Sequence, residues 1–261
     1  MFARSTPLAL PALCAVAVCG IGALPASASG PAQAAAASRP PSVETMIVGT
    51  GGKILAGARS VAAAATTLHV GGRGCAVAPA TPLAVLAAER RAGGPSFRLR
   101  DYGHCGPSPA NSGELFVYSI GGETNSGQSG WEYKVDGVSG STGAGDESGP
   151  MGNGRRLRSG DRVLWFWCEA VAGGCQRTLS VSPASATASP GGPLAVTVTA
   201  EDNEGRAIPV GGAIVTLGGA SAATAADGQA TLAAPSAPGS YQLQATRAGL
   251  VPSFPGTVLV G

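Results

Sequence analysis

The side chains that do acid–base chemistry are scarce in this sequence. The chain has 2 histidines, His69 and His104, and histidine is the most frequent general base in enzymes. His104 follows Asp101 closely, so one hypothesis is a catalytic His–Asp pair that activates one of the many serines. The sequence has no Gly-x-Ser-x-Gly elbow to supply an activated serine. We therefore interpret His104 as a loop residue beside Cys105 and predict no catalytic residues.

Metal and phosphate sites find equally little support. The two histidines and Asp101 lack the i, i+4 spacing that places two ligands on one helix face. The acidic pair Asp146-Glu147 lacks the alternating oxygen ligands of a calcium loop. Gly121-Gly122 is not followed by the Lys-Ser or Lys-Thr that ends a phosphate loop. These residues predict no metal, no cofactor and no enzyme activity.

Four of the 6 cysteines lie outside the N-terminal apolar stretch described below. Three disulfide pairings are open, and proximity favours Cys168–Cys175, which leaves Cys75–Cys105. Loop-closure entropy makes these bonds worth about 2.5 and about 3.7 kcal/mol, respectively. The alternative is a four-cysteine zinc site, which lacks the paired C-x-x-C spacing usual for structural zinc. Disulfides are the favoured interpretation, and they indicate an oxidising compartment.

The N-terminus has the layout of a secretory signal peptide over residues 1–28. Arg4 precedes an apolar run from Pro7 to Leu24, and Ala26-Ser27-Ala28 forms a small-x-small cleavage site. An uncleaved membrane anchor or a lipid on Cys14 or Cys19 are the alternatives. No later apolar stretch is long enough to span a bilayer. We expect a secreted or cell-surface-associated protein without an integral membrane span after cleavage.

Charge excludes one class of partner. The chain carries 17 basic and 15 acidic residues, and only one arginine leaves with the signal peptide, so the remainder is nearly neutral. A nucleic-acid-binding protein would show a basic stripe or tail. We therefore predict no nucleic-acid partner.

The aromatic residues are the most informative side chains for function. In the segment Arg162–Cys168, alternate side chains are large and apolar on both faces of a predicted strand. One face is expected to be core. The other must be covered by the helix, by a second module or by a ligand. The candidates for a ligand-binding surface are Tyr102, Tyr118, Trp165 and Trp167.

The elements that would position these residues fall into two modules. Residues 29–41 are rich in Ala, Pro and Ser and predict a disordered lead-in. Residues 42–177 predict an α+β module with one main helix, which begins at Thr81-Pro82 and ends at Gly93-Gly94-Pro95. Its strands are expected at 44–48, 61–70, 97–102, 115–120, 131–135 and 162–168, with a Gly-rich connection over 49–57.

Residues 178–261 predict a second, all-β module. Short β-like segments alternate there with turn clusters such as Asp227-Gly228 and Pro238-Gly239. Regular spacing of this kind is typical of an immunoglobulin-like or prealbumin-like sandwich. After a first segment at Leu179, strands are expected at 194–200, 213–217, 230–233, 241–246 and 257–260.

Three segments carry a resemblance to a known family. Thr81-Pro82-Leu83, the hairpin Trp131 to Gly137 and the final strand Gly160 to Trp167 resemble a bacterial secreted family of undefined function. That family is related to the C-terminal cobalamin-capping domain of transcobalamin and intrinsic factor. The resemblance spans about residues 43 to 177 and implies a β-grasp-like fold. Residues 178–261 similarly resemble carboxypeptidase-regulatory-like or bacterial immunoglobulin-like repeats.

The resemblance leaves two functions to compare. The resemblance implies cobalamin as a ligand, and no other feature of the sequence does. In transcobalamin a helical-barrel domain supplies much of the vitamin site, and this sequence shows no counterpart of that domain. The main hypothesis is a non-catalytic binding protein for a corrinoid-like small molecule, a cell-surface glycan or a protein. The alternative is a structural or adhesive surface protein without a small-molecule ligand. Burial of both Trp165 and Trp167 would favour the alternative.

Overall fold

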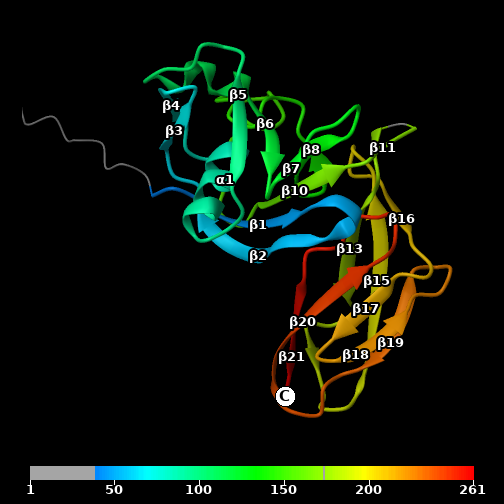
Figure 1. The fold of residues 1–261 in the computed structure, drawn as a ribbon. Coiled ribbons are helices and arrows are strands. Elements are labelled where there is room, and N and C mark those ends of the chain that lie inside the picture. The colour runs from blue at the N-terminus through cyan, green and yellow to red at the C-terminus, as the bar shows by residue number, and fades with distance from the viewer. Residues whose placement is uncertain (1–38, 173) are drawn as a thin grey trace, which may run out of the picture. The chain divides into compact units, whose positions relative to one another are not determined.

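The computed structural model describes residues 39–172 and 174–261 (Figure 1). The signal peptide predicted over 1–28 lies outside the described residues, as does most of the lead-in predicted over 29–41. The described chain is mostly β, which confirms the prediction, with one α-helix and two short 3-10 helices among these residues. None of the helices described is long and apolar enough to cross a membrane.

A five-stranded sheet organises the first half of the chain. Its order is β2-β1-β10-β8-β9, in which the central pair β1 and β10 is parallel and the other neighbours are antiparallel. Aromatic and β-branched residues, which favour strands, make up most of β10. The strands are β1 (Ser42–Val48), β2 (Ile54–Ala62), β8 (Gly130–Val135), β9 (Val138–Ser139) and β10 (Arg162–Cys168).

The single strand predicted over 61–70 is wrong. In the structure β2 ends at Ala62 and a separate strand, β3, begins at Thr66. The strand β2 also begins earlier than predicted, inside the Gly-rich connection and after the 3-10 helix η1 (Thr50–Gly52). The reason is pairing with β1, in which Ile54 faces Val48. Contact with a buried neighbouring strand outweighs the weak β propensity of Ala and Gly.

The predicted helix start is confirmed at α1 (Pro82–Arg91). The hydroxyl of Thr81 accepts a hydrogen bond from the backbone N–H of Ala84 at 3.2 Å, and Pro82 occupies the first turn. The helix ends at Ala92, ahead of Gly93, which has a left-handed φ of 89°. It packs against β1 and β2, and Arg59 of β2 binds the buried carboxylate of Glu89. The helix therefore covers one face of the sheet.

Two smaller sheets complete the first half. The strands β3 and β4 form a hairpin, and β5, β6 and β7 form an antiparallel sheet. The 3-10 helix η2 (Pro109–Glu114) lies directly before β6 in the chain. A two-residue pair, β11 and β12, follows β10. Their bounds are β3 (Thr66–Val70), β4 (Arg73–Val77), β5 (Phe97–Asp101), β6 (Leu115–Ile120), β7 (Glu123–Thr124), β11 (Ala170–Val171) and β12 (Gly174–Cys175).

Strands from Thr178 onward form two further sheets around their own core. In β15, Leu194, Val196 and Val198 are buried while the residues between them are exposed, which is the period of two that a half-buried strand requires. The first sheet contains β13 (Thr178–Pro183), β15 (Pro193–Glu201), β16 (Ala207–Pro209) and β19 (Gln229–Ala233). The second contains β14 (Thr187–Ala188), β17 (Ile214–Leu217), β18 (Ala220–Ala223), β20 (Gly239–Thr246) and β21 (Gly256–Val260).

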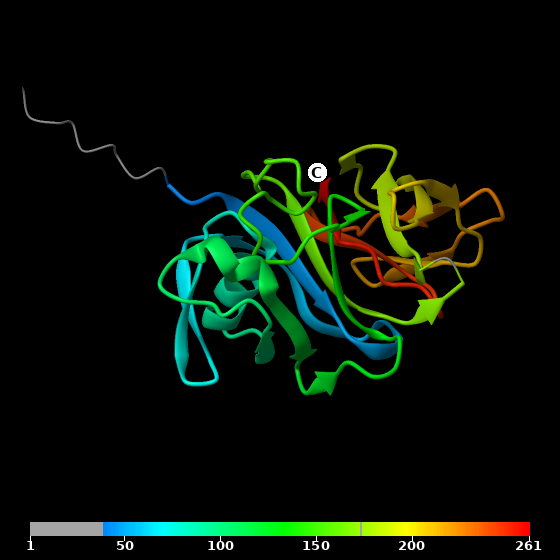
Figure 2. The ribbon, with the colours of Figure 1, turned by 90° about the horizontal axis from the view of Figure 1, so that it is seen from above.

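A third apolar cluster joins the two sets of strands. It contains Leu164 and Phe166 of β10 together with Val251, and Phe254 packs against it. In Figure 2, α1 lies on one side of β1 and β2, and the strands that follow Thr178 lie on the other side. We call this contact region the junction.

Candidate functional site

The strand β10 is covered on both faces by the chain itself. Trp165 and Trp167 point into the core that includes α1, and only 1% and 9% of their surfaces are exposed. On the opposite face, Leu164 and Phe166 belong to the junction cluster with Val251. The predicted alternation of the two faces is thus correct. The segment that follows β20 covers the second face, and no bound molecule is needed to do so.

The tryptophans of β10 pack against aromatic partners on β8. Trp167 meets Trp131 edge to face, with ring centroids 5.9 Å apart, and Trp165 lies 5.4 Å from Tyr133. The indole N–H of Trp131 donates to the carbonyl of Glu123 at 2.9 Å, and the hydroxyl of Tyr133 donates to the carbonyl of Thr142 at 2.9 Å. Burial raises the pKa of Tyr133 to about 12. Such satisfied polar tips are typical of core aromatics.

A small aromatic pocket of about 220 Å³ opens beside this cluster. Tyr102 and Phe116 stand at its rim, with 62% and 43% of their surfaces exposed and their rings 6.1 Å apart. The indole nitrogen of Trp165 is buried without a hydrogen-bond partner among the described residues. The aromatic residues lining the pocket are Tyr102, Phe116, Trp131, Tyr133 and Trp165.

Only two of the four predicted ligand-binding residues come together. Tyr102 and Trp165 line the aromatic pocket, whereas Tyr118 lines a different groove, where the Arg100 guanidinium lies 4.9 Å from its ring centroid. Trp167 is core. The candidate surface predicted from the sequence did not include Trp131 and Tyr133, which the structure places beside Tyr102 and Trp165 in the pocket lining. Their pairing opposite Trp167 and Trp165 is set by strand register, which alternation within one strand cannot reveal.

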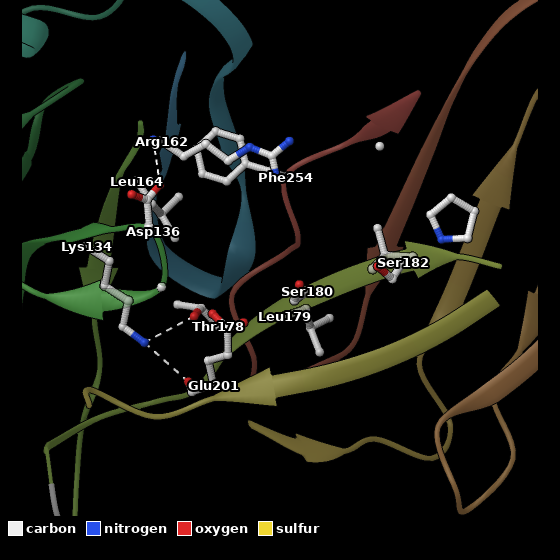
Figure 3. A pocket seen from close by; sticks show the side chains of 14 residues that line it. Lys134, Asp136, Arg162, Leu164, Thr178, Leu179, Ser180, Ser182, Glu201 and Phe254 are labelled. Carbon is white, nitrogen blue, oxygen red and sulfur yellow. Dashed lines mark hydrogen bonds between the residues drawn. The ribbon is translucent and has the colours of Figure 1, made fainter. Parts of the chain in front are cut away.

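A buried lysine spans the junction. Lys134 of β8 is 1% exposed, and its ammonium group donates to the Thr178 hydroxyl at 3.1 Å and to the carbonyls of Glu201 and Asp202 at 3.2 and 2.6 Å. Figure 3 shows the side chain extending from β8 to Thr178 and Glu201. Three donors meet three acceptors, so the charge is fully hydrogen-bonded. Burial nevertheless lowers the pKa of Lys134 to about 8. No sequence pattern had singled this residue out.

The cavity at the junction has a volume of about 420 Å³, and its charged lining residues are Lys134, Asp136, Arg162 and Glu201. The Arg162 guanidinium pairs with Glu44 at 2.7 Å and lies 5.6 Å from the Phe254 ring centroid. Burial raises the pKa of the Glu201 carboxyl at its edge. The Asp136 carboxylate, which also lines the cavity, accepts a hydrogen bond from the backbone N–H of Arg162 at 2.9 Å. The remaining lining side chains are mainly serines, threonine and aliphatic residues.

The carboxylate of Asp101, which precedes the histidine candidate His104, is bound by other groups. The carboxylate of Asp101 accepts hydrogen bonds from the backbone N–H groups of Gly103 and Cys105 and pairs with Arg73 at 2.9 Å. The Cys105 N–H and the other partners lower the pKa of Asp101. This carboxylate therefore shapes a turn around the exposed His104. Across residues 39–172 and 174–261, no three or more His, Cys, Asp or Glu side chains gather as metal ligands would.

The cysteines are paired as proximity favours. Cys75 on β4 is bonded to Cys105, and Cys168 at the end of β10 is bonded to Cys175 on β12. The first bond fastens the β3–β4 hairpin to the turn after β5. The second closes the short loop that leads toward β13. Disulfides persist in oxidising compartments, so both bonds are consistent with an extracellular or surface location.

Comparisons with known proteins add little to this description. No protein-family model matches the chain, and no curated protein matches it. Among solved structures, the D00-D0 domain of Intimin is similar over 56% of this chain and 89% of that chain, with 16% sequence identity and a TM-score of 0.25. At this TM-score the likeness is distant and says nothing further about this chain. The resemblance to the transcobalamin C-terminal domain gains no support from these searches.

Proposed function

We propose that the chain is a non-catalytic, exported protein with a structural or adhesive role at the cell surface, in which residues 42–177 and 178–261 act as one rigid pair of modules. The observation that carries the proposal is the coverage of both faces of β10 by the chain's own side chains. Large apolar residues that would otherwise mark a ligand surface serve as core and junction instead.

The buried lysine supports the rigid arrangement. Sliding of one module over the other would separate the Lys134 ammonium from Thr178 and from the two carbonyls that it binds. An unpaired buried charge costs several kcal/mol. The junction therefore favours one relative arrangement, which suits a spacer or adhesive protein that must hold its shape under load.

We also propose a β-grasp-like fold for residues 42–177 and an immunoglobulin-like fold for residues 178–261. A parallel central pair of strands flanked by antiparallel neighbours, with α1 on one face, supports a β-grasp-like first module. Two sheets around a common core support an immunoglobulin-like second module. The signal-like N-terminus and the two disulfides support export.

Bead adhesion combined with ligand titration tests this function. Inert beads coated with the chain would be counted on bacterial cell surfaces, and the same preparation would be titrated with cobalamins and cell-wall glycans while tryptophan fluorescence is followed. We expect bead retention above that of albumin-coated beads, with no saturable change in fluorescence. A saturable change with cobalamin and no bead retention would contradict the proposal.

The aromatic pocket favours a second candidate function, the binding of a small ligand. At about 220 Å³ it is smaller than the 300–1,000 Å³ usual for drug-sized ligands, so a corrinoid does not enter it. A single sugar ring or one side chain of a partner matches its size better, and the exposed rings of Tyr102 and Phe116 offer such a group apolar contact area. In a glycan titration, Tyr102→Ala would then weaken binding and Tyr118→Ala, outside the pocket, would not.

A further inference from the structure

A basic groove lies in the first module, away from the junction and from the aromatic pocket. It is bounded by β3, β5 and the last turn of α1, and its volume is about 550 Å³. Every residue of β3 lines it, and no residue of β4 does. Five residues of strand extend about 17 Å. The groove thus runs along the side of β3 that faces away from its hairpin partner, for the full length of that strand.

The groove is positively charged. Arg90, Arg91 and Arg98 line it, Arg100 lies beside them over the Tyr118 ring, and the lining contains no carboxylate. None of these four arginines takes part in an ion pair among the described residues. The acidic residues next to Arg90 and Arg100 in sequence are paired with other arginines, since Glu89 binds Arg59 and Asp101 binds Arg73. Arg91 donates to the Thr66 hydroxyl at 2.9 Å and Arg90 donates to the Gly94 carbonyl at 3.2 Å, but neither bond neutralises the charge of the guanidinium. The arginines can therefore attract an anionic partner.

The groove also borders unpaired strand edges. Within the described residues, β3 pairs only with β4, and β5 pairs on one side with β6. The two strands lie beside each other without joining into one sheet. An edge strand offers a row of backbone N–H and C=O groups that can pair with an added strand. This edge is not otherwise covered by a paired strand.

We propose that the groove binds an extended acidic peptide segment of a partner protein, added as a strand to the free edge of β3. Backbone hydrogen bonds along β3 would supply affinity. The arginines of α1 and β5 would bind Asp or Glu carboxylates, for which the guanidinium fork is well matched. Positive charge along the edge also repels basic strands, including a second copy of β3 with its neighbouring arginines, which selects for an acidic partner. This interaction goes beyond the structural or adhesive role and does not depend on it.

The edge distinguishes a peptide from other anions. Charge alone would attract a phosphate-bearing polymer as well as a peptide. A polymer without a peptide backbone makes no use of the unpaired groups of β3, whereas an extended peptide uses both the edge and the charge. Two independent observations, the free edge and the uncompensated arginines, therefore favour the peptide.

The test uses the full chain and a soluble octapeptide of alternating Glu and Thr. Binding would be followed by calorimetry or by fluorescence anisotropy of a labelled peptide. We expect binding that weakens as salt is raised. Arg90→Glu and Arg98→Glu should each raise the Kd for the peptide by about tenfold or more. Arg247→Glu, in the second module, is the matched control and should bind as the unmodified chain does, because Arg247 is exposed and makes no ion pair.

Two further probes decide between strand addition and charge alone. The same peptide with alternate backbone nitrogens methylated keeps its charge but cannot complete a strand ladder, so it should bind at least about tenfold more weakly. Equal binding of the methylated peptide, or tighter binding of inorganic polyphosphate at matched charge, would overturn the proposal in favour of a general polyanion groove. Failure of the unmethylated peptide to bind at low salt would overturn it outright.

Discussion

Lys134 is the residue whose chemistry is most altered by the fold. It is buried, fully hydrogen-bonded and shifted to a pKa of about 8 from an ordinary value of 10.5. Its ammonium group lies 6.0 Å from the centroid of the Phe166 ring. The same side chain thus contributes to the junction through hydrogen bonds and through a cation–π contact.

The shifted pKa of Lys134 predicts a specific pH dependence of stability. Between pH 8 and 10.5 the unfolded chain binds more protons at this lysine than the folded chain does. The free energy of unfolding attributable to Lys134 therefore rises with pH in that window, by up to about 2 kcal/mol between pH 8 and pH 9.5. Urea unfolding at several pH values in this range measures the rise.

Lys134→Met should abolish that rise, because Met does not titrate. The exposed Lys53 provides the matched control, and Lys53→Met should keep the rise. The measurement should stop below pH 10, where unfolded tyrosines begin to ionise and Tyr133, with its raised pKa, shifts stability in the opposite direction. An equally steep rise in Lys134→Met would show that the lysine is not its source.

For helices and strands, the sequence predicted the features that depend on residues close together in the chain. The start of α1 follows from Thr81 and Pro82, and the bounds and two-faced pattern of β10 follow from its alternating large residues. What could not be predicted is which strands meet. The split between β2 and β3, and the pairing that sets Tyr133 against Trp165, depend on neighbours that are distant in sequence. The roles of Lys134 and of the free edge of β3 could not be predicted either, because they too depend on neighbours that are distant in sequence.

The cap of α1 gives a prediction at this scale. The Thr81 hydroxyl accepts from the Ala84 N–H and donates to the Ala78 carbonyl at 3.0 Å, and both contacts are buried. Thr81→Ala should lower the free energy of unfolding by about 1–2 kcal/mol. Thr81→Ser keeps the hydroxyl and should retain most of the stability. Equal unfolding midpoints in urea for the two variants would contradict the assignment of the cap.

At the scale of the whole molecule, the junction decides whether the modules behave as one. Phe254 packs against the junction cluster and lies under the Arg162 guanidinium. Removal of its ring should loosen the contact and cost about 2 kcal/mol. We expect Phe254→Ala to convert a single calorimetric transition into two overlapping ones, because each module keeps its own core.

The control for Phe254→Ala is Phe116→Ala, which removes a ring that is 43% exposed and remote from the junction. Exposed substitutions usually change stability by no more than about 0.5 kcal/mol. The control should therefore keep one transition. Two transitions in the unmodified chain would mean that the modules are not coupled as proposed.

Thiol accessibility measures whether the second face of β10 is covered. Leu164 is 6% exposed and faces the junction, so Leu164→Cys should react with a thiol reagent only as fast as the chain opens. Phe116→Cys, at a position 43% exposed, should react at the rate of an accessible thiol. We expect Leu164→Cys to be protected by about a hundredfold or more relative to Phe116→Cys, corresponding to an opening free energy of about 3 kcal/mol or more. Similar rates for the two variants would show that this face of β10 is open, and the structural role proposed for its aromatic residues would be wrong.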